Sequence, residues 1–269
     1  MKHTAIWLAL GMGLAACAPK PATPLPEGRA ITLATPGRRI VGRLYPSKGP
    51  VRVLLVVLHG DGPNPPMRYH YDFAAAVAHD VAGVTAAGLM RPGYSDPTGR
   101  ASDGDNGNHA GGNYTPEAVD ALDAAIEDLK AEVHPARVIL VGHSGGAALV
   151  ADLMSRYPDV AGEAVLVSCP CDVPAWRQWM AGKQTAVAWR APVRSLSPQA
   201  LVSGIAPKAR VYLWVGARDA TALPRFSQAY AEALRARGVA AALTILPGRK
   251  HGILLDPAVI RGVEAIAAK

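Results

Sequence analysis

The amino-acid sequence predicts an α/β fold, in which a mostly parallel sheet is flanked by helices. The chain has 269 residues, half of them hydrophobic, which is enough to bury the core of one domain of this class. The run VRVLLVVL at residues 51–58 is almost continuously apolar, as expected of a strand that is covered on both faces. From there to the C-terminus, strand-like and helix-like segments alternate at the spacing of βαβ units, which build a parallel sheet.

The expected domain covers residues 29–269 and begins with a β-hairpin. Residues 29–34 and 38–45 alternate apolar and polar side chains on either side of a Thr-Pro-Gly turn, which is typical of antiparallel strands. After the strand at 51–58, we expect strands at residues 81–87, 137–141, 164–168, 210–215 and 241–246. We expect helices at residues 71–79, 116–132, 145–156, 224–237 and 257–267.

Two long segments interrupt this alternation. Residues 91–115 are rich in glycine, asparagine and aspartate, and a loop of this length inside a domain is usually functional or mobile. Its stretch 103–108 is crowded with oxygen ligands, but it lacks the glycine position and the terminal glutamate of an EF-hand loop, which favours a plain turn over a calcium site. Residues 169–208 are long enough to form a small helical cap.

The expected cap carries both aromatic and cationic side chains. Its tryptophans are Trp176, Trp179 and Trp189, and its cations near them are Arg177, Lys183, Arg190 and Arg194. The tryptophans could form either the core of the cap or a platform for substrate. The cations could attract an acidic substrate, although a solvated face explains them equally well.

The first 16 residues have the make-up of an export signal. A basic start precedes an apolar stretch that is too short to span a membrane comfortably, and small residues lead to Cys17. The tetrad Leu-Ala-Ala-Cys that ends at Cys17 resembles the lipobox of bacterial lipoproteins, in which the cysteine is lipidated; an ordinary secretory signal is the alternative. Residues 17–28 are rich in proline and predict an extended tether. The resemblance implies a membrane anchor in the cell envelope, at the periplasmic face of the outer membrane because Ala18 follows the cysteine.

Charge and cysteine content narrow the expected partners. The formal net charge is +7, but the lysines and arginines are scattered and accompany no nucleic-acid-binding motif, so we expect no nucleic-acid partner. The other cysteines, Cys169 and Cys171, could form a disulfide in an oxidising compartment if a tight turn brings them together. They do not have Cys-x-x-Cys spacing and no second pair accompanies them, so no zinc site is expected.

Residues 138–150 read VILVGHSGGAALV, an apolar strand that ends in Gly-x-Ser-x-Gly and passes directly into a helix. This is the sequence form of a nucleophile elbow, with Ser144 at its tip. Gly142 and Gly145 are expected to relieve crowding in the sharp turn, and the start of the helix favours developing negative charge. The same five residues could also form a turn without chemistry, so the motif alone does not decide.

A catalytic serine needs a base and a third group that orients the base. His251 follows the last expected strand, and Asp219 follows the strand before it. The order Ser, Asp, His, with each residue at the carboxyl end of a strand, is the order of an α/β-hydrolase. Asp172, which follows the strand at 164–168, is the alternative acid, and His109 in the long loop is the histidine hardest to dismiss as a rival base.

With these residues in place, the sequence resembles the α/β-hydrolase family over most of residues 38–267. Leu58-His59-Gly60-Asp61-Gly62 is similar to the family's oxyanion segment, and Arg91-Pro92-Gly93-Tyr94 is similar to a turn that many members carry. The resemblance implies the α/β-hydrolase fold with a short cap insertion. It also implies that the backbone N–H groups of Asp61 and Gly145 hold the oxyanion of a tetrahedral intermediate.

These residues predict a serine hydrolase that cleaves carboxylic esters of small molecules through an acyl-enzyme. His251 would take the proton of Ser144 and Asp219 would orient His251, with no metal and no organic cofactor. A serine peptidase or amidase with the same triad is the close alternative. A binding lipoprotein that keeps the fold without chemistry is the alternative from another class.

Overall fold

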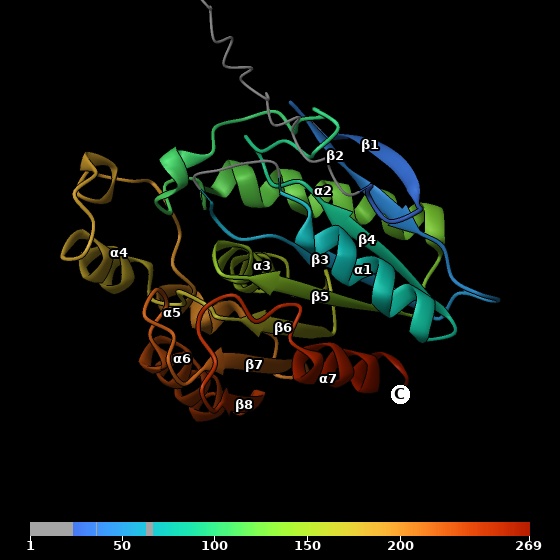
Figure 1. Ribbon diagram of the computed structural model, residues 1–269. Coiled ribbons are helices and arrows are strands. Elements are labelled where there is room, and N and C mark those ends of the chain that lie inside the picture. The colour runs from blue at the N-terminus through green and yellow to red at the C-terminus, as the bar shows by residue number, and fades with distance from the viewer. Residues whose placement is uncertain (1–23, 36, 63–66) are drawn as a thin grey trace, which may run out of the picture.

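The computed structural model describes residues 24–35, 37–62 and 67–269, and an eight-stranded sheet forms its centre. The strands are β1 (Arg29–Thr35), β2 (Arg38–Tyr45), β3 (Val53–Leu58), β4 (Val84–Leu89), β5 (Arg137–His143), β6 (Glu163–Val167), β7 (Arg210–Gly216) and β8 (Ala240–Leu246). Their spatial order is β1-β2-β4-β3-β5-β6-β7-β8 (Figure 1). The hairpin of β1 and β2 is antiparallel and joins β4, from which the sheet is parallel as far as β8. The predicted α/β class with a mostly parallel sheet is confirmed.

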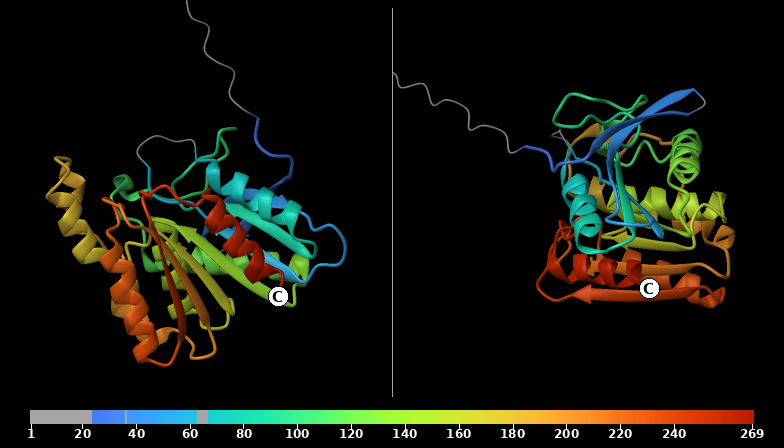
Figure 2. Two further views of the ribbon diagram at one scale, coloured as in Figure 1. Left: turned by 60° about the horizontal axis from the view of Figure 1, so that its bottom comes forward. Right: turned by 90° about the vertical axis from the view of Figure 1, so that its right-hand side faces the viewer.

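Helices cover both faces of the sheet. The longer ones are α1 (Tyr69–Asp80), α2 (Pro116–Val133), α3 (Gly145–Arg156), α4 (Val173–Ala181), α6 (Pro224–Ala236) and α7 (Pro257–Ala267). Short helical turns are η1 (Gly107–His109), η2 (Val187–Trp189), α5 (Pro198–Leu201) and η3 (Val202–Gly204). Helices α1 and α7 pack on one face, and α2, α3 and α6 pack on the other (Figures 1 and 2).

Strand β3 shows why the sheet must be covered on both sides. Its side chains alternate between the two hydrophobic clusters, with Leu54, Val56 and Leu58 in the cluster of α2 and α3 and with Leu55 and Val57 in the cluster of α1 and α7. Every residue of the strand is buried. A strand that alternates between two apolar faces has to be apolar throughout.

Two element boundaries differ from the sequence prediction. The strand expected at 81–87 is β4, which begins three residues later, because Val81 ends α1 and Gly83 turns the chain with a φ of +84°. The helix expected from residue 71 begins at Tyr69. The segment between β6 and β7 contains α4, η2, α5 and η3. Helix α4 and the turn η2 form a small helical cap that stands out beside the sheet in Figure 1, whereas α5 and η3 pack against α3.

The N-terminal predictions fall on another part of the chain. The export signal at 1–16, Cys17 and most of the tether lie outside the described residues. Within the described part of the chain, no helix is long and apolar enough to cross a membrane.

Candidate active site

Ser144 stands at the turn between β5 and α3 with a φ of 53° and a ψ of −122°, a backbone conformation that residues other than glycine seldom adopt. The turn can close because its flanking glycines have no side chains. A Cβ on Gly142 would overlap the carbonyl oxygen of Gly146, and a Cβ on Gly146 would overlap that of His59. The backbone crowding therefore falls on Gly142 and Gly146, whereas Gly145 faces the side chains of Tyr114 and Asp61.

The structure brings Ser144, His251 and Asp219 into one chain of hydrogen bonds. Ser144 Oγ lies 2.9 Å from His251 Nε2, and His251 Nδ1 lies 2.9 Å from Asp219 Oδ2. The second oxygen of the buried Asp219 accepts the N–H groups of Thr221 and Ala222, each at 2.9 Å. Asp219 is thereby fixed as the acceptor for Nδ1–H, which leaves Nε2 free to accept the serine proton.

The rival acid lies away from His251, and the rival histidine lines the pocket at Ser144 but contacts a tyrosine there. Asp172 caps the N-terminus of α4, where its carboxylate accepts the N–H of Ala175 at 3.1 Å. His109 Nδ1 lies 3.3 Å from Tyr94 Oη in the long loop. Among the described residues, the carboxylate that meets His251 is therefore that of Asp219.

The oxyanion segment after β3 lies directly against the elbow. A Cβ on Gly60 would stand 2.8 Å from Ser144 Cβ, so the backbone of Gly60 lies against the serine. Asp61, the next residue in the chain, therefore begins close to Ser144. Gly145 is the first residue of α3, and the first N–H groups of a helix have no carbonyl partner within that helix. The two amides predicted for the oxyanion thus belong to segments on either side of Ser144.

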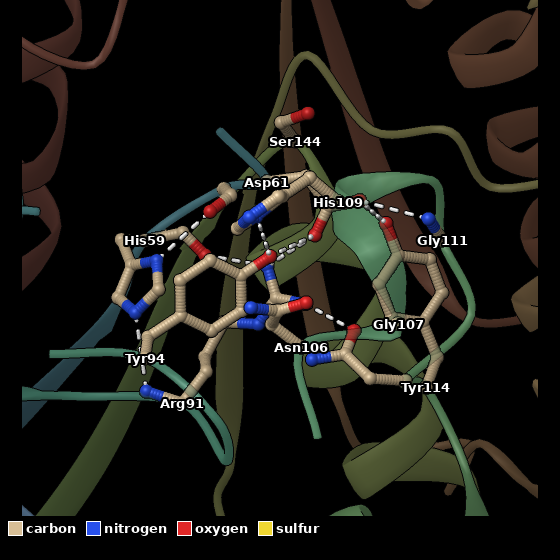
Figure 3. Close-up of polar contacts among 12 residues, drawn as sticks. His59, Asp61, Arg91, Tyr94, Asn106, Gly107, His109, Gly111, Tyr114 and Ser144 are labelled. Atoms are coloured by element: carbon tan, nitrogen blue, oxygen red, sulfur yellow. Dashed lines mark hydrogen bonds and ion pairs between the residues drawn. The ribbon is translucent and has the colours of Figure 1, made fainter. Parts of the chain in front are cut away.

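The side chain of Asp61 is only 8% exposed and lies in a cluster of polar contacts that the sequence did not reveal (Figure 3). Its Oδ1 lies 2.9 Å from Arg91 Nη1 and accepts the hydroxyl of Tyr94 at 3.2 Å. Its Oδ2 accepts the hydroxyl of Tyr114 at 2.6 Å and the N–H of Gly111 at 3.2 Å. Burial, and then the charge of Asp61, raises the pKa of Tyr114 well above its ordinary value, so this hydroxyl remains a donor.

This cluster gives the long loop a structural role. Arg91, fully buried, also donates to the carbonyl of His59 at 3.2 Å and to Asn113 Oδ1 at 2.7 Å. The loop between β4 and α2 is thus tied to the oxyanion segment after β3. The sequence did contain a signal for this contact. Asp61 follows β3 and Arg91 follows β4, and neighbouring parallel strands end side by side, so an ion pair between these two residues could have been predicted.

The oxygen-rich stretch of the same loop makes turns and a surface ion pair. Asp103 lies 3.0 Å from Arg39 Nη2, and Asp105 and Asn106 accept nearby backbone N–H groups. Within the described ranges, no group of three histidine, cysteine or acidic side chains is placed to hold a metal ion. Cys169 and Cys171 form a disulfide at the carboxyl end of β6, with their Cα atoms 5.1 Å apart.

A pocket of about 340 Å³ opens beside Ser144 and His251. Its apolar walls come from the cap, where Trp176 and Trp189 meet edge to face with ring centres 5.2 Å apart and Met180 lies next to them. A somewhat larger hollow of about 420 Å³ lies among the charged residues at the amino ends of β5, β6 and β7, at the opposite edge of the sheet. The pocket at the serine is therefore the one that matters for chemistry.

The fold and the residues at its carboxyl edge define a serine hydrolase with the α/β-hydrolase fold. More narrowly, the chain belongs to the family described as serine aminopeptidase, S33, which matches residues 51–210. The matched region includes the oxyanion segment and the elbow, whereas Asp219 and His251 lie beyond it. No curated protein matches the chain.

Solved structures of esterases and of peptidases share the fold. Est1E from Butyrivibrio proteoclasticus has a TM-score of 0.62 at 14% identity, over 90% of this chain and 96% of that one. Esterase PE8 has a TM-score of 0.62 at 21% identity, over 84% of this chain and 96% of that one. An acylaminoacyl peptidase of Pyrococcus horikoshii has a TM-score of 0.66 at 14% identity and matches 88% of this chain. This chain spans about two fifths of the length of the acylaminoacyl peptidases, with 39% and 40% covered.

Proposed function

We propose that this serine hydrolase cleaves small carboxylic esters through an acyl-enzyme on Ser144. The observation that carries the proposal is the hydrogen-bonded chain from Ser144 Oγ through His251 to Asp219. His251 Nε2 takes the hydroxyl proton as Oγ attacks the ester carbonyl, and Asp219 stabilises the imidazolium that forms. The N–H groups of Asp61 and Gly145 hold the oxyanion.

The tetrahedral intermediate then collapses and the ester C–O bond breaks. His251 gives its proton to the departing alkoxide, which leaves as the alcohol, and the acyl group stays on Ser144. In the second half of the reaction, water attacks the acyl carbonyl as His251 takes one of its protons. The carboxylic acid is released and the serine hydroxyl is restored, so one ester and one water give one alcohol and one acid.

The state of Asp61 favours esters over peptides with a free amino terminus. An aminopeptidase must bind the α-ammonium group of its substrate, for which an unpaired carboxylate is the natural partner. Asp61 carries the one carboxylate among the described residues that line the pocket. A carboxylate has about four acceptor positions, and those of Asp61 are taken by Arg91, Tyr94, Tyr114 and Gly111. The pocket therefore offers a neutral, partly aromatic wall instead of an anchor for an amine.

Turnover of p-nitrophenyl butyrate and of aminoacyl p-nitroanilides tests the proposal. We expect the ester to have the higher kcat/KM, and a fluorophosphonate probe to label the wild type but not Ser144→Ala. Faster turnover of the aminoacyl anilide would make the protein a peptidase, the activity for which its family is named. A folded wild type that hydrolyses neither substrate and takes up no probe would overturn the assignment of catalysis altogether.

We also propose that Cys17 carries a lipid that anchors the enzyme in the envelope, at the periplasmic face of the outer membrane. The tetrad at 14–17 and the proline-rich residues after it support this location. In a bacterial host, full-length protein grown with radioactive palmitate is expected to take up label and to sediment with membranes. Cys17→Ser should abolish labelling; label retained by this variant contradicts the assignment.

A further inference from the structure

A line of hydrogen bonds connects the oxyanion segment to the backbone of His251. The N–H of Gly60 donates to Tyr69 Oη at 2.6 Å. Tyr69 Oη lies 2.9 Å from Nδ1 of His143, the residue before the serine. Nε2 of His143 lies 3.1 Å from the carbonyl oxygen of His251.

The direction of each bond in this line is determined. A carbonyl oxygen can only accept, so Nε2 of His143 carries the proton that points to His251. Burial, and then the charge of His251, lowers the pKa of His143 to about 3, so the ring is neutral and its Nδ1 accepts from Tyr69. Burial of its hydroxyl raises the pKa of Tyr69 to about 12, so the tyrosine keeps the proton that it donates.

The two ends of the line are groups on which the proposed reaction depends. The Gly60 N–H belongs to the peptide directly before the one that carries the Asp61 amide, and the carbonyl of that second peptide lies 2.8 Å from His59 Nδ1. Tyr69 therefore fixes the backbone from which the oxyanion amide projects. The carbonyl at the other end belongs to His251, the base, and accepts a second hydrogen bond from Ser168 Oγ at 2.9 Å. The line therefore connects the backbone of the oxyanion donor with the backbone of the base.

We propose that Tyr69 and His143 are positioning residues, which hold the Asp61 amide and the His251 imidazole in register around Ser144; this inference rests on the proposed function. Neither side chain lines the pocket at Ser144, so neither is expected to touch the substrate. Because the oxyanion develops only on the way to the transition state, a misplaced donor lowers kcat and leaves substrate binding unchanged.

Helix α1 offers a matched control. Tyr71 lies on the same helix and is fully buried, but its hydroxyl contacts Asp96 Oδ2, at 3.4 Å, outside the line. Tyr69→Phe and Tyr71→Phe each remove one tyrosine hydroxyl from α1. A general effect of such a loss on the packing of this helix would appear in both variants.

The experiment measures kcat and KM for p-nitrophenyl butyrate and the affinity of phenylboronic acid, which forms a tetrahedral adduct with a reactive serine. For Tyr69→Phe we expect kcat to fall about tenfold, as for the loss of one hydrogen bond, with KM unchanged and boronate affinity reduced by a similar factor. For Tyr71→Phe we expect all three within twofold of the wild type. The same kcat in both variants overturns the proposal.

A double-mutant comparison tests whether the two residues act as one line. His143→Phe breaks both of its bonds, so adding Tyr69→Phe to it should cost little more, whereas independent roles give multiplied losses. His143→Gln keeps a donor and an acceptor and should recover part of kcat. A double variant whose loss of kcat equals the product of the two single losses contradicts the line.

A spectroscopic readout separates this inference from the proposed function. Imidazole 15N shifts of the wild type should show His143 as the neutral Nε2–H tautomer, with an Nδ1 shift that changes in Tyr69→Phe. A protonated Nδ1 on a neutral ring overturns the line of bonds whatever the activity. A wild type with the expected shifts but no ester turnover and no fluorophosphonate labelling keeps the line and rejects the esterase.

Discussion

At the scale of single residues, the contacts of Asp219 and Asp172 predict opposite effects of substitution on catalysis. Asp219→Asn presents an amide where His251 needs an acceptor, so we expect kcat for p-nitrophenyl butyrate to fall by about 10,000-fold. Asp172→Asn leaves an equally good helix cap on α4 and should stay within twofold of the wild type. Steady-state kinetics of the two purified variants check this prediction. A large loss in Asp172→Asn with a small one in Asp219→Asn would exchange their roles.

The residues of the site differ in how far the sequence could predict them. Ser144, Asp219 and His251 each follow an apolar strand in the order of the fold, so strand ends alone place them near one another. Asp61 also follows a strand, but only its backbone could be interpreted from the motif. The burial of its carboxylate depends on Tyr114, which lies 53 residues later along the chain. Side-chain partners at such a separation are decided by the path of a loop, which has no periodic pattern.

At the scale of elements, α3 carries a buried acid that the chemistry does not use. Both carboxyl oxygens of Asp152 are buried and have no hydrogen-bond partner among the described residues. Burial raises the pKa of Asp152 well above its ordinary value of 3.8, although Arg156 opposes this shift. The folded protein then holds a proton that the unfolded chain releases above pH 4. Its contribution to stability is therefore complete at low pH and is lost as the pH rises toward the folded pKa.

Asp152→Asn removes this titration and should stabilise the protein at the alkaline end. Relative to the wild type, we expect its free energy of unfolding to rise by about 1.4 kcal/mol per pH unit above pH 4, until the folded wild type also ionises. Urea unfolding at pH 5, 6 and 8 measures the difference. The control is Asp159→Asn, because that carboxylate is 89% exposed. A difference between Asp152→Asn and wild type that does not change with pH contradicts the assignment.

The elements themselves were predictable to different degrees. Strands β3 and β5 and helix α3 have uniform apolar patterns, and the structure places them where periodicity does. The start of β4 was displaced because Val81, which follows the polar end of α1, caps that helix, and the turn at Gly83 separates it from the strand. In the cap, Arg177 is buried and donates to the carbonyls of Ala188 and Ala191, so it holds the cap turn and is not free to attract an acidic substrate.

At the scale of the whole molecule, the parallel sheet explains why distant segments form one site. Strands β3, β5, β7 and β8 end at the same edge of the sheet. The loop after each of them carries one residue of the site: Asp61, Ser144, Asp219 and His251, in that order. The mostly parallel sheet could be predicted from the alternation of strands and helices along the chain. The pocket could not, because its walls come from the cap and the long loop, whose packing against the edge follows from individual contacts.

The whole molecule also buries neutral histidines, and these set its response to acid. Burial lowers the pKa of His70 and, with the charge of His251, that of His143 to about 3, and it lowers the pKa of His59 well below 6.5. Between pH 6.5 and about 3 the unfolded chain binds protons at these sites and the folded protein does not. The contribution of these histidines to the free energy of unfolding is therefore complete above pH 6.5. It is lost as the pH falls, by about 1.4 kcal/mol per pH unit for each histidine.

His70 packs against His59 with ring centres 5.0 Å apart, but neither of its ring nitrogens has a hydrogen-bond partner among the described residues, so this argument can be tested at His70 without removing a hydrogen bond. His70→Leu should cost some packing energy at every pH but reduce the slope of unfolding free energy against pH, between pH 5 and 6, by the equivalent of one proton. The control His134→Asn changes an exposed histidine at the end of α2 to a residue that also accepts its left-handed backbone, and should leave the slope as it is. Asp152 has the opposite sign in this pH range, and so has Asp123, whose pKa burial raises to about 6, so the wild-type slope should be smaller than the three protons of the histidines alone. Equal slopes for His70→Leu and wild type would mean that the buried ring is protonated in the folded protein, contrary to the neutral state inferred from its burial.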